Sequence, residues 1–128
     1  MTLVVDASVV IKWFVQENQH EDAIRFLEHA SDLLAPDLLV AEVANVVWKK
    51  CMRKEIDANQ AQIIVSAIPN FIAEIQPSTH LAERALEIAL ALNHSVYDCL
   101  YIACAEKADG VLVTADARLF NKTRNTEF

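Results

Sequence analysis

The chain has 128 residues, of which 54% are hydrophobic and 23% charged, and it contains 1 glycine and 3 prolines. This composition excludes a disordered chain and predicts a single domain over residues 1–128, with long helices and short connections. The net charge of -7 opposes nucleic-acid binding through bulk electrostatics. A phosphate-containing substrate would therefore require local cations or a metal ion.

No apolar run reaches the roughly 18 to 20 residues that a membrane-spanning helix needs, and Asp6 interrupts the apolar N-terminus. Cys51, Cys99 and Cys104 match no zinc-binding spacing, which favours buried, reduced thiols. These features predict a cytoplasmic protein without a membrane partner. Among the four histidines, His94 is interpreted as a loop residue, because no partner lies at metal-ligand spacing.

In the first half of the chain, apolar patterning predicts strands that alternate with helices. The predicted elements are a strand at 3–5, helices at 7–14 and 21–30, a strand at 32–35 and a helix at 36–54. Pro36 is expected in the first turn of the last helix, where a missing N–H costs nothing. Between Leu38 and Trp48 only Glu42 and Asn45 are polar, so most of this helix is expected to be buried.

The second half continues the same alternation. Asp57 and Gln60 predict a capping box that opens a helix ending before Pro69. The remaining predicted elements are a strand at 71–75, a helix at 79–92, a helix opening at Ser95, a strand at 110–114 and a short helix from about 117. The helix at 79–92 is expected to bury Ala82, Ala85, Leu86, Ala89 and Leu90. Gly110 is expected to break the chain between the last long helix and its strand.

Four carboxylates fall at equivalent places in this pattern. Asp6 and Asp116 follow strands, Glu42 lies early in the helix after a strand, and Asp98 begins a helix. In a parallel sheet all these positions lie at the edge where the strands end, which is where open α/β sheets bind ligands. Each acid also has a structural explanation: three could cap helices, and Glu42 could lie on a narrow solvent-facing stripe.

As a set, the four acids predict a metal site. Oxygen ligands suit Mg²⁺ or Mn²⁺, which bind through a few carboxylates together with substrate phosphates. Two such ions could activate water and stabilise the leaving oxygen during cleavage of a phosphodiester. Two cations near this edge in sequence, Lys12 and Arg118, are predicted to contact substrate phosphates. A separate basic cluster, Lys49, Lys50, Arg53 and Lys54, is interpreted as a solvated helix end.

Sequence motifs around these acids resemble those of PIN-domain ribonucleases, and within them the VapC-type toxins of toxin–antitoxin pairs. The matching segments are Val5-Asp6-Ala7-Ser8, residues 39–45 (LVAEVAN), residues 97–103 (YDCLYIA) and residues 113–119 (VTADARL). Together they cover nearly the whole chain. The resemblance implies an α/β fold of three layers, with a central parallel sheet of four or five short strands flanked by helices.

The same resemblance implies a function and a set of site residues. It implies a Mg²⁺-dependent endoribonuclease, with Mn²⁺ as a second candidate cofactor, that forms a homodimer and is inhibited by a cognate antitoxin. The implied catalytic residues and metal ligands are Asp6, Glu42, Asp98 and Asp116, with Ser8 and Thr114 as neighbouring substrate contacts. Related chains commonly continue past the position equivalent to Phe128 into a final short strand, which is the reason for expecting either four or five strands.

Three other functions are found in small acidic domains of this kind: a receiver, a phosphatase and a binding module. A receiver domain would carry a phosphoacceptor aspartate where this chain has Ile75-Gln76-Pro77, and a haloacid-dehalogenase-like phosphatase would carry a second aspartate at Ser8. Neither fits the sequence. The third alternative is a catalytically silent binding module whose acidic edge binds a basic, antitoxin-like partner, which the net charge favours. Metal-dependent cleavage of RNA would separate this alternative from the nuclease.

Overall fold

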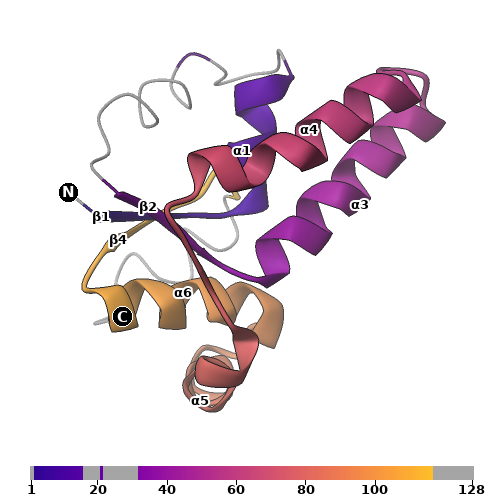
Figure 1. Cartoon of the computed structure of the whole chain (residues 1–128). Helices are drawn as coiled ribbons and strands as arrows, with labels where there is room; N and C mark the ends of the chain where they lie inside the picture. The colour runs from indigo at the N-terminus through magenta and orange to yellow at the C-terminus, as the bar shows by residue number, and fades with distance from the viewer. Residues whose placement is uncertain (1, 16–20, 22–31, 117–128) are drawn as a thin grey trace.

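The computed structural model describes residues 2–15, 21 and 32–116 of the chain. Within these residues, strands and helices alternate as predicted (Figure 1). The elements are β1 (Thr2–Val5), α1 (Ala7–Phe14), β2 (Asp32–Pro36), α3 (Leu38–Met52), α4 (Ala58–Phe71), β3 (Glu74–Gln76), the 3₁₀ turn η1 (Ser78–His80), α5 (Ala82–Leu92), α6 (Val96–Ala108) and β4 (Val111–Val113).

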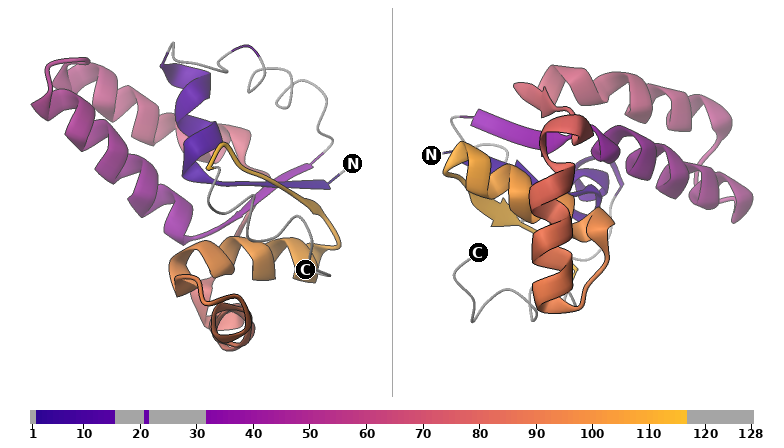
Figure 2. Two further views of the ribbon diagram at one scale, coloured as in Figure 1. Left: turned by 180° about the vertical axis from the view of Figure 1, so that it is seen from behind. Right: turned by 90° about the horizontal axis from the view of Figure 1, so that it is seen from below.

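The strands form one parallel sheet in the order β3-β2-β1-β4. In this register Leu3 of β1 lies opposite Leu33 of β2 and Val111 of β4. Figures 1 and 2 show α1 and α4 on one side of the sheet and α6 on the other, with α5 outside α6. The first strand is thus covered on both faces, which explains why it reads as an unbroken apolar run. The predicted three-layer α/β fold is confirmed.

Near the N-terminus, the predicted strand at 3–5 and helix at 7–14 are confirmed. The predicted helix at 21–30 lies, except for Glu21, outside the described residues. Pro36 does not begin α3 as predicted but ends β2, where it lies opposite Gln76 of β3. The ring fixes a backbone angle that suits both a strand end and a helix start, so the sequence alone could not decide between them. The helix starts two residues later, at Leu38.

The prediction that most of α3 would be buried is wrong. Its fully buried residues are Leu39, Val43 and Val47, which form one stripe, whereas Trp48 is 56% exposed and Met52 66%. Figures 1 and 2 show α3 and α4 lying side by side and projecting from one end of the sheet. A helix that projects in this way has a core on one side only, so its remaining apolar residues stay exposed.

The boundary between α4 and β3 also differs from the prediction. The capping box of Asp57 and Gln60 is present, but the helix passes through Pro69 and ends at Phe71, which was expected in a strand. The ring of Phe71 packs against Trp13 and Phe14, with centroid distances of 6.1 and 5.6 Å. These aromatic contacts compensate for the hydrogen bond that a proline removes from the last turns of the helix. The strand β3 therefore begins only at Glu74.

The buried face of α5 is rotated relative to the prediction. Ala85 and Ala89 are buried as expected. The other residues predicted to be buried, Ala82, Leu86 and Leu90, are exposed, and Ile88 and the preceding Leu81 are buried instead. The apolar residues of this helix cover more than one face, so periodicity did not determine which face meets α6. The first turn, predicted as part of the helix, is the separate 3₁₀ turn η1.

The helix α6 is buried from Cys99 to Ala105 and begins at the cap Ser95, as predicted. The left-handed residue after it is Asp109, with φ 52°, rather than Gly110. Gly110 is required for another reason: a Cβ atom there would lie 3.0 Å from the backbone oxygen of Thr2 in β1. The glycine thus permits close approach of the chain to β1. The helix predicted from about residue 117 lies outside the described residues.

In the described part of the chain, no single helix is long and apolar enough to cross a membrane. The pair α5 and α6 reaches the required length and composition only together, with an angle of 116° between the two helices.

Candidate active site

Asp6 lies between β1 and α1 and is only 6% exposed. Its carboxylate caps α1 by accepting a hydrogen bond from the Val9 N–H at 3.3 Å. One oxygen, Oδ1, also accepts from the Ser8 hydroxyl at 2.5 Å, and the other accepts from the Thr114 hydroxyl. Burial raises the pKa of Asp6, and the three hydrogen bonds oppose that rise. The carboxylate is therefore held in one orientation by neutral donors.

Ser8 and Thr114 tie Asp6 to the segment after β4. The Ser8 oxygen accepts the Ala115 N–H at 2.9 Å, and the Thr114 oxygen accepts the Asp116 N–H at 2.9 Å. Both hydroxyls were predicted to contact substrate. Here their bonds join residues 107 and 108 positions apart in the sequence, which brings the segment that carries Asp116 close to Asp6. Substrate contact by either hydroxyl stays a prediction.

Glu42 lies in the second turn of α3 and is half-buried. Its carboxylate accepts a hydrogen bond from the phenol hydroxyl of Tyr101 on α6. Burial raises the pKa of Glu42, the bond from Tyr101 opposes this rise, and the nearby charges of Asp98 and Asp6 add to it. Tyr101 itself is buried, and its pKa is raised by burial and by the Glu42 carboxylate. The prediction from sequence did not include Tyr101, although it lies three residues after Asp98, on the same face of α6.

Asp98 lies in the first turn of α6, and its N–H donates to the Ser95 hydroxyl at 3.4 Å. Its side chain turns back to His94, with 2.5 Å between Nε2 and Oδ2. His94 lies in the loop between α5 and α6, as interpreted, but its side chain is only 5% exposed because it contacts Asp98. The spacing of four residues was visible in the sequence. It was overlooked because it crosses the start of the helix.

All four predicted acids belong to one electrostatic group. The charge of Asp116 contributes to the raised pKa of Asp6, and the charges of Asp98 and Asp6 contribute to that of Glu42. The topology explains this, because each acid lies at the edge where the parallel strands end. Like charges at one buried edge favour binding of a cation.

The four predicted acids at this edge supply carboxylates, which are ligands for divalent metal ions. Within the described residues, no three side chains of His, Cys, Asp or Glu converge closely enough to form a coordination set by themselves. Mg²⁺ is commonly bound through one or two carboxylates, with waters and substrate oxygens as its other ligands. The bonds to Asp6 and Glu42 described above come from hydroxyls and one backbone N–H, so these groups leave the negative charge in place. Carboxylate oxygens of this kind would suit Mg²⁺ or Mn²⁺ if waters or substrate oxygens supplied the remaining ligands.

The structure gives less information on the two basic residues that were predicted to contact substrate. Lys12 lies in the last turn of α1, about 9 Å along the helix from its start at Asp6. Arg118 lies outside the described residues.

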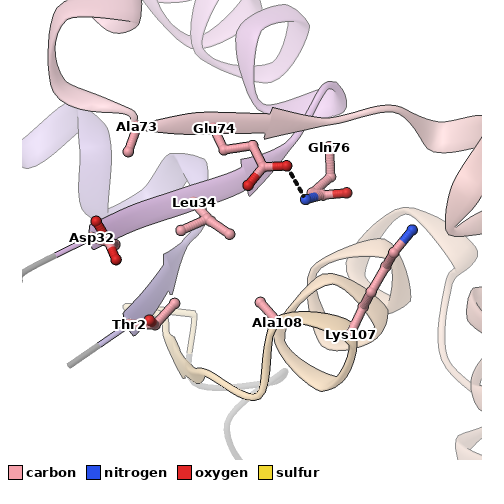
Figure 3. A pocket seen from close by; sticks show the side chains of 8 residues that line it. All are labelled: Thr2, Asp32, Leu34, Ala73, Glu74, Gln76, Lys107 and Ala108. Atoms are coloured by element: carbon pink, nitrogen blue, oxygen red, sulfur yellow. Dashed lines mark hydrogen bonds between the residues drawn. The ribbon is translucent and has the colours of Figure 1, made fainter.

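A hollow of about 440 Å³ occurs elsewhere, at the opposite edge of the sheet (Figure 3). Thr2, Asp32 and Glu74, the first residues of β1, β2 and β3, line it together with Lys107 of α6. Glu74 accepts a hydrogen bond from Gln76 there at 2.7 Å. None of the predicted site residues lines this hollow, so it is separate from the acidic edge.

Comparisons with known proteins agree on one family. The sequence profile of the PIN domain matches residues 3–125. Ribonuclease VapC3 of Pyrobaculum aerophilum is 36% identical over 124 residues, which is 95% of each chain. Ribonuclease VapC1 of Mycobacterium tuberculosis is 34% identical, over 91% of this chain and 86% of that protein.

Two solved structures share the fold. PAE2754 from Pyrobaculum aerophilum superposes with a TM-score of 0.75 and 23% identity, covering 98% of this chain and 87% of that one. Mycobacterium tuberculosis VapC20, described as a toxin that cleaves the sarcin–ricin loop, superposes with a TM-score of 0.76 and 16% identity, covering 94% and 95%. From the profile match and the identity to its relatives, the chain belongs to the PIN-domain family, and within it to the VapC type.

Proposed function

We propose that this protein is a metal-dependent endoribonuclease, the toxin of a toxin–antitoxin pair, which uses Mg²⁺ or Mn²⁺ at the four-carboxylate edge. The observation that carries the proposal is Asp6: a carboxylate only 6% exposed, oriented by three neutral donors and coupled to other acids. The relatives of this protein that are named as ribonucleases support RNA as the substrate. A buried acid without a cation costs stability, which a bound metal ion would offset.

In this proposal the carboxylates of Asp6, Glu42, Asp98 and Asp116 would bind the metal ion, directly or through the waters around it. When bound, the ion would lower the pKa of a water and stabilise negative charge on the phosphate. The protein's own contribution is orientation. Ser8 and Thr114 fix both oxygens of Asp6, Tyr101 fixes Glu42, and His94 fixes Asp98. Water attacks the phosphorus as the bond to one ribose oxygen breaks, and that oxygen takes up a proton.

The test is cleavage of defined single-stranded RNAs with Mg²⁺, with Mn²⁺ and with EDTA, followed by mapping of the ends. We expect internal cuts with either metal and none with EDTA. Asp6→Asn, Glu42→Gln, Asp98→Asn and Asp116→Asn should each remove most of the activity, because each loses a charged ligand. Asp57→Asn is the matched control: it makes the same charge change at an exposed helix cap, where asparagine serves equally well.

Wild-type activity in any one of the four variants would remove that residue from the site. Cleavage that survives EDTA would contradict metal dependence altogether. RNA left intact under every condition would favour the second candidate, a silent acidic module that binds a basic partner. That candidate is supported by the net charge of -7 and by the lack, among described residues, of three convergent ligands.

We propose a cognate antitoxin as the inhibitor, with an Arg- or Lys-containing segment that occupies the acidic edge. Inhibition should then weaken as Mg²⁺ is raised, because the segment and the metal compete for the same carboxylates. Inhibition insensitive to Mg²⁺ and to substitutions at the edge would indicate a remote interface.

We also propose that the protein is a homodimer that acts in the cytoplasm. Exposed apolar side chains on α3, α5 and α6, among them Trp48, Leu90 and Tyr97, support self-association. The cytoplasmic location is supported by the free cysteines Cys51, Cys99 and Cys104, because thiols stay reduced in that compartment. Light scattering after size-exclusion chromatography tests the dimer, and Trp48→Glu compared with Leu90→Glu identifies which helix mediates it. A monomer at every concentration would contradict the proposal.

A further inference from the structure

One helix joins the acidic edge to the main basic cluster of the chain. Four of the 11 Lys and Arg residues fall within residues 49–54, at the end of α3 and just after it. An α-helix turns about 100° per residue, so Lys49 and Arg53 lie about 20° to either side of Glu42 and roughly 40° from each other around the axis. Lys49 follows Glu42 by about 10 Å along the helix and Arg53 by about 16 Å. We call the line from Glu42 through Lys49 to Arg53 the α3 stripe.

The cations of the α3 stripe are accessible. Lys49 and Arg53 are exposed, and within the described residues neither makes a salt bridge. Lys50 differs, because its side chain is only 12% exposed and lies 3.5 Å from Glu55. Within the cluster at 49–54, the exposed cations without a described salt bridge are therefore Lys49 and Arg53 on the stripe and Lys54 just after it.

The α3 stripe is a separate face of its helix. The core-facing side carries Leu39, Val43 and Val47, and the exposed apolar side carries Trp48 and Met52. Glu42, which begins the stripe, faces Tyr101 of α6 and hence the acidic edge. Figure 1 shows α3 leading away from the sheet, so the stripe runs outward from the site. Preference of cations for helix C-termini explains why lysines occur there but does not explain their alignment with Glu42.

We propose that the α3 stripe binds the backbone of single-stranded RNA on one side of the phosphate that is cut, with Lys49 and Arg53 contacting phosphates. This inference rests on the proposed ribonuclease function and adds the path of the substrate. An acidic protein needs such a local tract, because its overall charge repels RNA. Phosphates a few nucleotides from the cut would be held while the acidic edge meets only the reacting one.

The test uses Lys49→Ala, Arg53→Ala and the double variant, with Lys107→Ala as the matched control. Lys107 is an exposed lysine of α6 at the opposite edge of the sheet, so its substitution changes net charge equally. Binding of a fluorescein-labelled, mixed-sequence single-stranded RNA is followed by anisotropy in Mg²⁺ across a salt series, in an Asp6→Asn background that prevents cleavage. Each stripe variant should reduce the slope of log affinity against log salt by about 0.7, and the control should not.

Cleavage by the otherwise wild-type protein provides the second measurement. We expect KM to rise with kcat unchanged in the stripe variants, since these contacts are the same in the ground and transition states. Lys49→Arg should retain the wild-type KM. An RNA shortened from the end that lies on α3 should lose its sensitivity to Lys49→Ala, whereas one shortened from the other end should keep it.

The outcomes are separable from those of the proposed function. If the wild type cuts RNA but the stripe variants match Lys107→Ala in slope and KM, the α3 stripe is not a substrate path. If no RNA is cut but the slopes change as expected, the stripe stands as an RNA-binding site and the nuclease proposal fails. Unchanged RNA binding with weakened binding of an acidic protein partner would reassign the stripe to that partner and overturn the inference.

Discussion

At the scale of single residues, the carboxylates of Asp6, Glu42 and Asp98 each have a side-chain partner that sets their orientation. Asp6 is bound by Ser8 and Thr114, Glu42 by Tyr101, and Asp98 by His94. Outer partners of this kind commonly contribute tenfold to a hundredfold to metal affinity. Replacing Tyr101 or His94 tests this contribution, because neither substitution changes a carboxylate.

We expect His94→Ala to weaken Mn²⁺ binding by about tenfold to a hundredfold, because the Asp98 carboxylate loses the donor that orients it. His94→Gln keeps a nitrogen donor and should recover part of the affinity. Isothermal titration with Mn²⁺ measures both, and His80→Ala, at an exposed position, is the control. Equal Mn²⁺ affinity in wild type and His94→Ala would leave His94 with a packing role only.

Tyr101→Phe should lower the free energy of unfolding by about 1–3 kcal/mol at neutral pH, because it leaves the half-buried Glu42 carboxylate without its donor. It should also raise the pKa of Glu42 further, since the hydrogen bond from Tyr101 favours the ionised form. Urea denaturation measures the first effect. Tyr97→Phe, on the same helix but 66% exposed, should change little. A loss of equal size in both variants would show that the bond to Glu42 is not the cause.

At the scale of elements, the connection from α6 to β4 brings the last strand against the first. Asp109 takes the left-handed conformation, and Gly110 leaves room for the backbone of Thr2. Any side chain at position 110 would press on β1 just where its register with β4 is set.

We therefore expect Gly110→Ala to lower the free energy of unfolding by about 1–3 kcal/mol through overpacking against Thr2. Asp109→Gly, one residue earlier, should stay within about 1 kcal/mol of the wild type, because glycine accepts the left-handed angle readily. Thermal or urea denaturation of the two variants separates the steric effect at position 110 from the conformational effect at position 109. A stable Gly110→Ala protein would mean that β1 and β4 shift apart at little cost.

A comparison of predicted and observed elements shows how much of the fold and of the candidate site could be predicted from the sequence. Strand ends, helix starts and the acids beside them followed from apolar runs and capping residues, which are local signals. Pro36, Phe71 and the buried face of α5 were predicted wrongly, because their placement depends on partners distant in sequence: Gln76 for Pro36, and Trp13 with Phe14 for Phe71. The role of His94 was overlooked because a contact between a loop and a helix has no periodic pattern.

At the scale of the whole molecule, the acidic edge makes stability depend on pH and metal. The pKa values of Asp6 and Glu42 are raised above their ordinary values of 3.8 and 4.5. An acid whose pKa is higher in the folded protein than in the unfolded chain contributes to stability at low pH. The contribution is complete below the unfolded pKa and is lost as pH rises through the folded pKa. Asp37 and Glu106, whose pKa values are lowered by bonds from Ser78 and Arg84, act in the opposite direction.

Comparison of wild type with Glu42→Gln isolates the contribution of the acidic edge. In EDTA at pH 7, Glu42→Gln should be the more stable, and its advantage should shrink as pH falls below the raised pKa of Glu42. Mg²⁺ at a hundredfold excess over Kd should stabilise the wild type by about 2.7 kcal/mol and the variant by less. Thermal denaturation across pH and Mg²⁺ measures both. Equal Mg²⁺ shifts in the two proteins would exclude Glu42 from the metal site.

The hydrogen bond between Asp6 and Thr114 has a consequence for synthesis of the protein. The two residues are separated by 108 positions, and β1 cannot pair with β4 until residues 111–113 have left the ribosome. A nascent chain that has made Asp6, Glu42 and Asp98 still lacks the strand that orients the first acid. Because such long-range pairing forms late, the acidic edge stays incomplete in the nascent chain until β4 and Thr114 have emerged and paired with β1 and Asp6.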